Sequence, residues 1–403
     1  MINEKMYALG STRSKIRELF EYGKELSKKI GAENVFDYTL GNPSVPCPEK
    51  VTKTIISEVQ NPSIHGYTSA QGDLGARKAI CDYNFNRYGF SLSPDLTYLT
   101  CGAAAGLAIT LRALISSPSD KVLTFAPFFP EYKVFTENAG GSLIYAKCDE
   151  STFDIDFNAF ELAITSDVQA VIINSPNNPS GTVYSEDSIV KLSKILSAKQ
   201  TEYGHAIYLI CDEPYREILF DGAVCPFIPK YYDNTVVCYS YSKALSIPGE
   251  RIGYVSVSPK AENAQKLYLA IAGAGRSLGY VCAPSLFQKV IEKCVDSVSD
   301  STVYKDNRDL LVSNLTRLGF TCVNPKGAFY VFMKSPVPSA NEFCDVCKTY
   351  GLLVVPSDSF GIDGYVRLAT CVSTDLIKRS IPALEKIAKL YNLFKNRAIW
   401  HGF

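Results

Sequence analysis

Four short apolar runs, separated by stretches with helical periodicity, limit most strongly what this chain can fold into. The runs are KVLTFA (121–126), QAVIIN (169–174), AIYLICDE (206–213) and NTVVCYSYS (234–242), and a turn signal follows each one. Continuous apolar strands between helices predict a parallel sheet that helices cover on both faces. We therefore predict an α/β fold, with a three-layer αβα large domain and a mainly parallel sheet at residues 41–285.

The pattern changes after about residue 290. A helical stretch to Leu318 precedes the strand-like segments GAFYVFM, GLLVVPS and YVRLATC, and a helix is expected near 340–350. This order predicts a smaller α+β domain at residues 286–403. An N-terminal segment, residues 1–40 with a helix at about 13–30, is expected to join it. A chain of 403 residues is long enough for two such domains.

Composition argues against several classes of protein. Lys plus Arg and Asp plus Glu each number 41, so no net field points to nucleic acid or to a membrane surface. No window approaches eighteen continuous apolar residues, and the first residues lack the apolar core of a signal peptide. The 13 scattered cysteines suit reduced thiols. We therefore expect a cytoplasmic protein with no nucleic-acid or membrane partner.

One CxxC pair, Cys344 and Cys347, lies in the segment FCDVCKTYG. Structural zinc sites usually combine two such pairs, or one pair with histidines. This segment has neither a second pair nor a nearby His. We expect no metal site and no redox function there.

The segment SYSKALSIPGERIGY (240–254) carries the first candidate chemistry. A lysine between a strand and a helix is usually only a solvated cation, but here Ser240, Ser242 and Arg251 surround Lys243 in sequence. Hydroxyls and a guanidinium together can hold a phosphate. A lysine beside a phosphate-bearing aldehyde is placed to form a Schiff base. The cofactor that fits both requirements is pyridoxal phosphate.

Other residues have the chemistry that this cofactor needs. Asp212 ends an apolar strand, where a bare carboxylate is unfavourable, so it can pair with the protonated ring nitrogen. Tyr215 and Asn178 can bond the phenolic oxygen, and Phe129 can stack on the ring. The alternatives are a turn-capping Asp, a packing Tyr, a turn-forming Asn and a core Phe. The turn TCGAAAGL opens a helix whose free N–H groups suit a phosphate.

With these residues in view, the chain resembles a class I/II aminotransferase of the pyridoxal-phosphate fold type I superfamily over nearly its whole length. The motifs that carry the resemblance, in the family's order, are LGNPSVP, HGYTSAQGDLGARKAI, TCGAAAGL, APFFPEY, NSPNNPSGTVY, CDEPYRE, SYSKALSIPGERIGY, PKGAFYVF and FGIDGYVRLA. The resemblance implies an enzyme that moves an amino group from an L-amino acid to a 2-oxo acid through a Lys243 aldimine.

The resemblance also implies roles for single residues. Lys243 would be the Schiff-base lysine and proton shuttle, with Asp212 on the pyridinium, Tyr215 and Asn178 on the phenolic oxygen, and Phe129 on the ring face. The phosphate would be held by the backbone of Ala103 and Ala104 with Ser240, Ser242 and Arg251. Tyr67 would reach the phosphate of a neighbouring subunit, which implies a homodimer with shared sites. The substrate α-carboxylate would bind Arg367, with Gly41 and Asn178 nearby.

The residues leave the choice of substrate open. Arg367 lies inside an apolar strand, where a buried ion pair with Asp or Glu is the alternative to a substrate carboxylate. Position 104 is Ala, where some bacterial aspartate aminotransferases carry a Lys for the distal carboxylate of the substrate. No other residue clearly replaces that Lys; Arg276 is a candidate for reaching a neighbouring subunit's site, with an ion pair on the surface as the alternative. Acidic, aromatic and aliphatic donors all remain.

Two other functions compete with transamination. A pyridoxal-phosphate C–S lyase or decarboxylase on the same scaffold would use the same Lys, Asp and Arg and differ only in what leaves the substrate. A transcription regulator would carry a basic DNA-binding domain ahead of this fold. Since the family-like region begins within the first forty residues, we do not expect a regulator.

Overall fold

The computed structural model describes residues 2–11 and 15–393, which form two compact units. Unit 1 comprises Met1–Ser44, Thr302–Pro325 and Phe329–Phe403, and unit 2 comprises Val45–Ser301 and Lys326–Ala328. Residues 1, 12–14 and 394–403 belong to the predicted segments 1–40 and 286–403 but lie outside the described residues.

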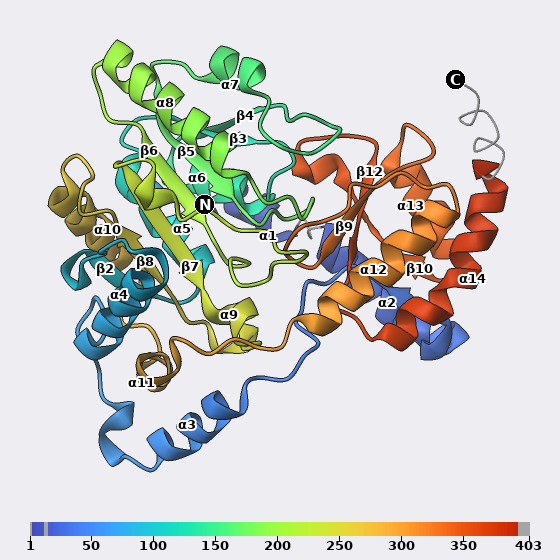
Figure 1. The fold of residues 1–403 in the computed structure, drawn as a ribbon, viewed down its shortest axis with the longest axis horizontal. Helices are drawn as coiled ribbons and strands as arrows, with labels where there is room; N and C mark the ends of the chain where they lie inside the picture. Colours follow the sequence, from blue (N-terminus) through green and yellow to red (C-terminus); the bar gives the residue numbers. More distant parts are fainter. Residues whose placement is uncertain (1, 12–14, 394–403) are drawn as a thin grey trace. The chain divides into compact units, whose positions relative to one another are not determined.

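Unit 2 is built on a seven-stranded sheet in the order β2-β8-β7-β6-β5-β3-β4 (Figure 1). Its strands are β2 (Thr97–Thr100), β3 (Lys121–Phe125), β4 (Ser142–Ala146), β5 (Val168–Asn174), β6 (Tyr208–Asp212), β7 (Thr235–Ser240) and β8 (Gly253–Val257). Five neighbouring strands, β7, β6, β5, β3 and β4, pair in parallel with one another. Strand β8 pairs antiparallel with both β7 and β2. The four apolar runs are β3, β5, β6 and β7, so the predicted mainly parallel sheet is confirmed.

Helices cover both faces of this sheet because β5 is apolar on both sides. Ala170 and Ile172 belong to one core cluster, which includes residues of α5 (Ala103–Leu114), α6 (Glu131–Ala139) and α10 (Ala264–Leu278). Val171 and Ile173 belong to another, with residues of α7 (Phe157–Ala163) and α8 (Glu186–Tyr203). Side chains alternate across a strand, so this division gives the predicted three layers.

The other helices of unit 2 are α3 (Glu49–Val59), α4 (Leu74–Tyr88), α9 (Tyr241–Ala244) and α11 (Ser285–Cys294), with 3-10 turns η2 (Pro62–His65), η3 (Pro94–Leu96), η4 (Ile228–Lys230) and η5 (Pro248–Glu250). Phe287, Val290 and Ile291 of α11 share a core cluster with Val51 of α3 and Ile80 of α4.

Because α11 packs against α3 and α4, the boundary between the two units lies later in the chain than the sequence suggested. The units divide at 44/45 and 301/302, whereas the sequence suggested 40/41 and 285/286. The helical stretch expected from about 290 to Leu318 is also two helices, since α11 ends at Cys294 and the next helix begins at Thr302. The assignment of separate domains stays a prediction.

Unit 1 is the smaller α+β unit. Its three-stranded antiparallel sheet has the order β11-β12-β9, and a separate parallel pair joins β1 to β10. The strands are β1 (Phe36–Asp37), β9 (Tyr330–Lys334), β10 (Leu352–Leu353), β11 (Val355–Pro356) and β12 (Tyr365–Ala369). The helices are α1 (Glu4–Ser11), α2 (Lys15–Ile30), α12 (Thr302–Arg317), α13 (Ala340–Thr349) and α14 (Thr374–Leu390), with turns η1 (Ala32–Asn34) and η6 (Ser357–Phe360). The segments GAFYVFM and YVRLATC contain β9 and β12, as expected, while GLLVVPS forms two short strands.

Several features concern the whole described chain. Within residues 2–11 and 15–393, no helix combines the length and apolar character that crossing a membrane requires. No cluster of three or more His, Cys, Asp or Glu side chains in the same residues has a metal-binding arrangement. Cys344 and Cys347 are free thiols buried in α13, and burial raises the pKa of Cys344 to about 12.

One close backbone approach fixes how the start of β8 meets the start of α5. Gly253 starts β8, and a Cβ there would overlap the carbonyl oxygen of Tyr239 and lie 3.0 Å from the Cα of Gly102. Gly102 directly precedes α5. Both neighbours are backbone atoms, which cannot move aside without shifting β7 or the start of α5.

We predict that Gly253→Ala destabilises the protein by about 1–3 kcal/mol, the usual cost of forcing an extra group into a packed site. The measurement is the thermal unfolding midpoint. Gly249→Ala is the matched control, because a Cβ at Gly249 meets nothing within 4 Å. Equal midpoints for the two variants would show that β8 and α5 are free to separate.

Candidate active site

The ends of the parallel strands β5 and β6 bring two predicted residues, Asn178 and Asp212, close together. In the sheet register Asn174 of β5 lies beside Asp212 of β6, and Asp212 lies beside Cys238 of β7. The amide of Asn174 donates to the main-chain oxygen of Asp212 at 2.8 Å, and the N–H of Asn178 donates to Asn174 Oδ1 at 2.7 Å. The loop that carries Asn178 is therefore held against the end of β6.

Asp212 is a buried carboxylate with unequal oxygens. Asp212 is only 4% exposed, and its Oδ2 accepts a hydrogen bond from the Tyr132 hydroxyl at 2.6 Å. Oδ1 has no hydrogen-bond partner among the described residues. Burial raises the pKa of Asp212 to about 7; the Tyr132 hydrogen bond lowers it, and the neighbouring Glu213 raises it. The carboxylate needs a further donor or cation to be favourable in its charged form.

Tyr132 is a residue that the sequence reading missed, although it stands in the quoted segment APFFPEY. It lies in the first turn of α6, where it is fully buried, and the predicted stacking residue Phe129 stands three positions before it. The two rings meet edge to face with centroids 5.7 Å apart. The sequence signal for Tyr132 is its position one helical turn after an aromatic residue that follows a strand.

The turn around Lys243 brings its two serines and Arg251 together. Lys243 lies in the short helix α9, with a half-exposed side chain. Ser240 Oγ and Ser242 Oγ are 2.8 Å apart, and Arg251 Nη1 lies 3.4 Å from Ser242 Oγ. Nη1 also donates to the Pro248 oxygen at 2.7 Å, which fixes the guanidinium over the turn.

The start of α5 lies beside the same guanidinium. Arg251 Nη2 is 3.4 Å from the carbonyl oxygen of Cys101. Gly102, with φ of 83°, precedes α5, and a Cβ there would lie 2.8 Å from Nη2. Ala103 is buried and Ala104 is exposed at the start of the helix. Free N–H groups, two hydroxyls and a guanidinium together form an arrangement that suits an anion.

The remaining predicted residues of unit 2 differ in their surroundings. Tyr215 is buried three residues after Asp212. Tyr67 is fully exposed, so this chain alone does not bring it into the cluster. Its loop is nevertheless anchored, because Gln288 Nε2 donates to Thr68 Oγ1 at 3.1 Å. Arg276, near the end of α10, is exposed.

Arg367 and Gly41 belong to unit 1. Arg367 is 2% exposed in β12, and its Nη2 donates to the Thr39 carbonyl at 2.7 Å. Its guanidinium lies 4.5 Å from the ring centroid of Tyr330. Gly41 lies beside the same ring, since a Cβ on Gly41 would overlap the Tyr330 hydroxyl.

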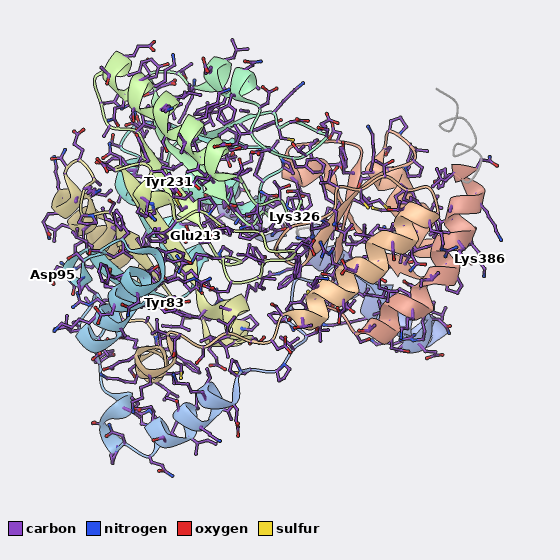
Figure 2. All side chains as sticks on the ribbon, in the orientation of Figure 1. Tyr83, Asp95, Glu213, Tyr231, Lys326 and Lys386 are labelled. Carbon is purple, nitrogen blue, oxygen red and sulfur yellow. The ribbon has the colours of Figure 1, made fainter. Side chains whose placement is uncertain are left out.

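Next to Asp212, the chain contains a second buried carboxylate with its own cation. Glu213, labelled in Figure 2, accepts a hydrogen bond from Arg216 at 2.7 Å, and both residues are buried. The Arg216 guanidinium lies 4.4 Å from the ring centroid of Tyr239 and also contacts the Tyr254 hydroxyl. These two residues were not singled out in the sequence, although CDEPYRE contains both.

Known proteins match this chain over most of its length. The family model described as aminotransferase class I and II matches residues 33–384. The aspartate aminotransferase of Thermotoga maritima is 30% identical over 383 residues, covering 94% of this chain and 97% of the relative. The LL-diaminopimelate aminotransferase of Dehalococcoides mccartyi is 28% identical over 398 residues, covering 93% and 96%. An amino transferase structure from Eubacterium rectale superposes with a TM-score of 0.96 at 53% identity, covering 97% of this chain and 99% of that one.

The burial of Asp212 gives a prediction about stability without any bound ligand. Its folded pKa of about 7 lies above the unfolded value of about 4. The folded state therefore binds the extra proton between these values, and stability is lost as the pH rises through the folded pKa. Asp212→Asn removes that charge, so the ligand-free variant should be more stable than wild type at pH 8.

The measurement is the unfolding midpoint of ligand-free protein at pH 5, 6.5 and 8. The advantage of Asp212→Asn should be largest at pH 8 and should shrink toward pH 5. Asp95→Asn is the control, because Asp95 is exposed at the edge of unit 2 (Figure 2). A variant less stable than wild type at every pH would refute the account of Asp212 as an unfavourably buried charge.

Proposed function

The chain belongs to the aminotransferase class I and II family, and on that premise we propose that it transfers the amino group of an L-amino acid to a 2-oxo acid, with pyridoxal phosphate as its cofactor. The observation that carries the proposal is the buried carboxylate of Asp212, whose Oδ1 has no hydrogen-bond partner among the described residues. A protonated pyridine nitrogen is a cation of the kind that would stabilise this oxygen.

The surroundings of Arg251 support the phosphate end of the same cofactor. We assign the phosphate to Ser240, Ser242 and Arg251, together with the backbone N–H groups of Ala103 and Ala104. The start of α5 favours negative charge, and the close approach of Gly102 to Arg251 leaves no room for a side chain between them. Hydroxyl, guanidinium and helix N–H donors match the chemistry of a phosphate.

Bound pyridoxal phosphate supplies an aldehyde and a ring that accepts electrons from the substrate Cα–H bond. In the proposal, Lys243 Nζ would hold the aldehyde end of the cofactor, and its free amine would move the proton of the substrate Cα. Asp212 would keep the ring nitrogen protonated. Tyr215 and Asn178 would donate to the phenolic oxygen, and Phe129 would pack on the ring face.

A second copy of the chain completes the site in this proposal. Tyr67 is fully exposed on a loop whose backbone is anchored: Cys282 Sγ lies 3.5 Å from the Thr68 oxygen, and Ser285 Oγ donates to the Ile64 oxygen at 2.6 Å. A large side chain that is fully exposed on an anchored loop is suited to meet another molecule. We assign the Tyr67 hydroxyl to the phosphate in the partner, which makes the enzyme a homodimer.

We assign the substrate α-carboxylate to Arg367 and Gly41 of unit 1, with Asn178 as a further proposed binding residue. A guanidinium binds a carboxylate through two parallel hydrogen bonds, and every amino donor has that carboxylate. The two relatives described above are named for aspartate and for LL-diaminopimelate, which are both α-amino acids. Ala104 offers no charge to a distal carboxylate, so the proposal extends to L-α-amino acids as a class rather than to aspartate alone.

Lys243→Ala should lower kcat by roughly 10²–10⁴-fold or more, because it removes the group that moves the Cα proton. The near-visible absorption band of the cofactor-loaded protein should also shift, because the aldehyde of pyridoxal phosphate stays unreacted while the cofactor still binds through Arg251 and the serines. Turnover and absorbance spectra of loaded wild type and variant test this. The control is Lys386→Ala, since Lys386 is an exposed lysine on α14 (Figure 2). Wild-type turnover in Lys243→Ala would overturn the assignment.

A further inference from the structure

Contacts on several sides hold the Arg367 side chain within unit 1. It occupies the middle of β12, opposite Val355 of β11 and Phe332 of β9. The Tyr330 ring lies 4.5 Å from its guanidinium carbon and the Phe360 ring 5.4 Å. Stacking against aromatic rings restricts the plane of a guanidinium.

A hydrogen-bonded segment holds one edge of that plane. Arg367 Nη2 donates to the carbonyl oxygen of Thr39 at 2.7 Å. The N–H and the hydroxyl of Thr39 both donate to Asp37 Oδ1, at 2.8 and 2.6 Å. Asp37 therefore fixes Thr39, the residue whose carbonyl oxygen meets the arginine.

Tyr38, which stands between Asp37 and Thr39, holds the same segment through its own hydrogen bonds. The N–H of Tyr38 donates to the Leu353 oxygen at 3.0 Å, and the N–H of Ala369 donates to the Tyr38 oxygen at 2.9 Å. The Tyr38 hydroxyl lies 2.7 Å from Ser380 Oγ. Residues 37–39 thus run beside the end of β12 with their peptide groups engaged, and the Thr39 carbonyl has a fixed direction.

The Tyr330 ring is fixed as well. A Cβ on Gly41 would overlap the Tyr330 hydroxyl and lie 3.3 Å from Phe329 Cε2. The glycine is therefore required by the ring, and the ring lies against the arginine. Phe329 and Tyr330 also meet edge to face with centroids 5.1 Å apart, which restricts rotation of the ring.

We propose that Asp37, Thr39 and Tyr330 are positioning residues that fix the plane of the Arg367 guanidinium for two-pronged binding of the substrate α-carboxylate. The inference rests on the proposed function, because it takes Arg367 as the carboxylate-binding residue. Thr39 occupies one nitrogen, and the Tyr330 ring sets the plane in which a carboxylate is bound. A guanidinium whose plane is free to turn binds a carboxylate more weakly, because binding must then fix that plane.

The experiment measures the dissociation constants of two unreactive carboxylates, succinate and 3-phenylpropionate, for the cofactor-loaded enzyme by calorimetry. They have unlike side chains, so a shared effect reports on the common carboxylate. Tyr330→Leu should raise both constants about tenfold or more, since a desolvated cation–π contact of this kind is lost. Tyr330→Phe keeps the ring that faces the guanidinium and should stay within about twofold of wild type.

The Asp37 pair tests the hydrogen-bonded segment separately. Asp37→Asn retains an oxygen that accepts from Thr39 and should stay close to wild type, whereas Asp37→Ala should weaken both carboxylates several-fold. Phe343→Leu is the control for a lost buried ring, because Phe343 is fully buried in the core of unit 1 and its nearest rings are Phe320 and Tyr391. It should lower the unfolding midpoint and leave both dissociation constants unchanged.

Arg367→Lys separates failure of this inference from failure of the proposed function. It should weaken both carboxylates by about 30-fold or more, the usual effect of breaking a desolvated charge pair. If Arg367→Lys has no effect on either, Arg367 does not bind the carboxylate and the proposed role fails. If Arg367→Lys weakens both while Tyr330→Leu matches Phe343→Leu, only the positioning role is overturned.

Discussion

A carboxylate buried at the end of a central parallel strand is unfavourable unless donors or a cation accompany it. Asp212 and Glu213 are two such carboxylates in adjacent positions, and the chain treats them differently. Arg216 pairs with Glu213 inside the protein, whereas Tyr132 donates to only one oxygen of Asp212. The other oxygen of Asp212 has no hydrogen-bond partner among the described residues, and in the proposed function it faces the ring nitrogen of the cofactor. Because β5, β6 and β7 pair in parallel, the loops that follow them leave the same edge of the sheet.

The two arginines assigned to anions share a structural device. Arg251 in unit 2 donates to the Pro248 oxygen, and Arg367 in unit 1 donates to the Thr39 oxygen. In each case a main-chain carbonyl accepts a hydrogen bond from one guanidinium nitrogen and thereby orients the guanidinium before any ligand binds. An arginine fixed in this way loses less conformational freedom on binding, which favours affinity for phosphate or carboxylate. A chain with no net charge can therefore bind two anionic groups by local geometry.

The sequence predicted those parts of the fold and site that local pattern determines. Apolar runs predicted β3, β5, β6 and β7. Strand ends predicted that the Asn178 loop lies against the end of β6, because neighbouring parallel strands end at one edge. Tyr132 was missed because its contact with Asp212 depends on how α6 packs, 80 residues earlier in the chain. The Thr39 contact of Arg367 spans 328 residues, and α11 joins unit 2 through its packing, so neither has a local signal. The roles of the individual site residues stay predictions.

Stoichiometry without an acceptor tests the central claim most directly. Cofactor-loaded enzyme is mixed with each of a panel of L-amino acids in the absence of any 2-oxo acid, and 2-oxo acid, ammonia and carbon dioxide are quantified. Transamination predicts at most one equivalent of 2-oxo acid per site, no ammonia, and further turnover only after a 2-oxo acid is added. Continuous release of ammonia with pyruvate, or of carbon dioxide, would contradict the account and identify a lyase or a decarboxylase on the same scaffold.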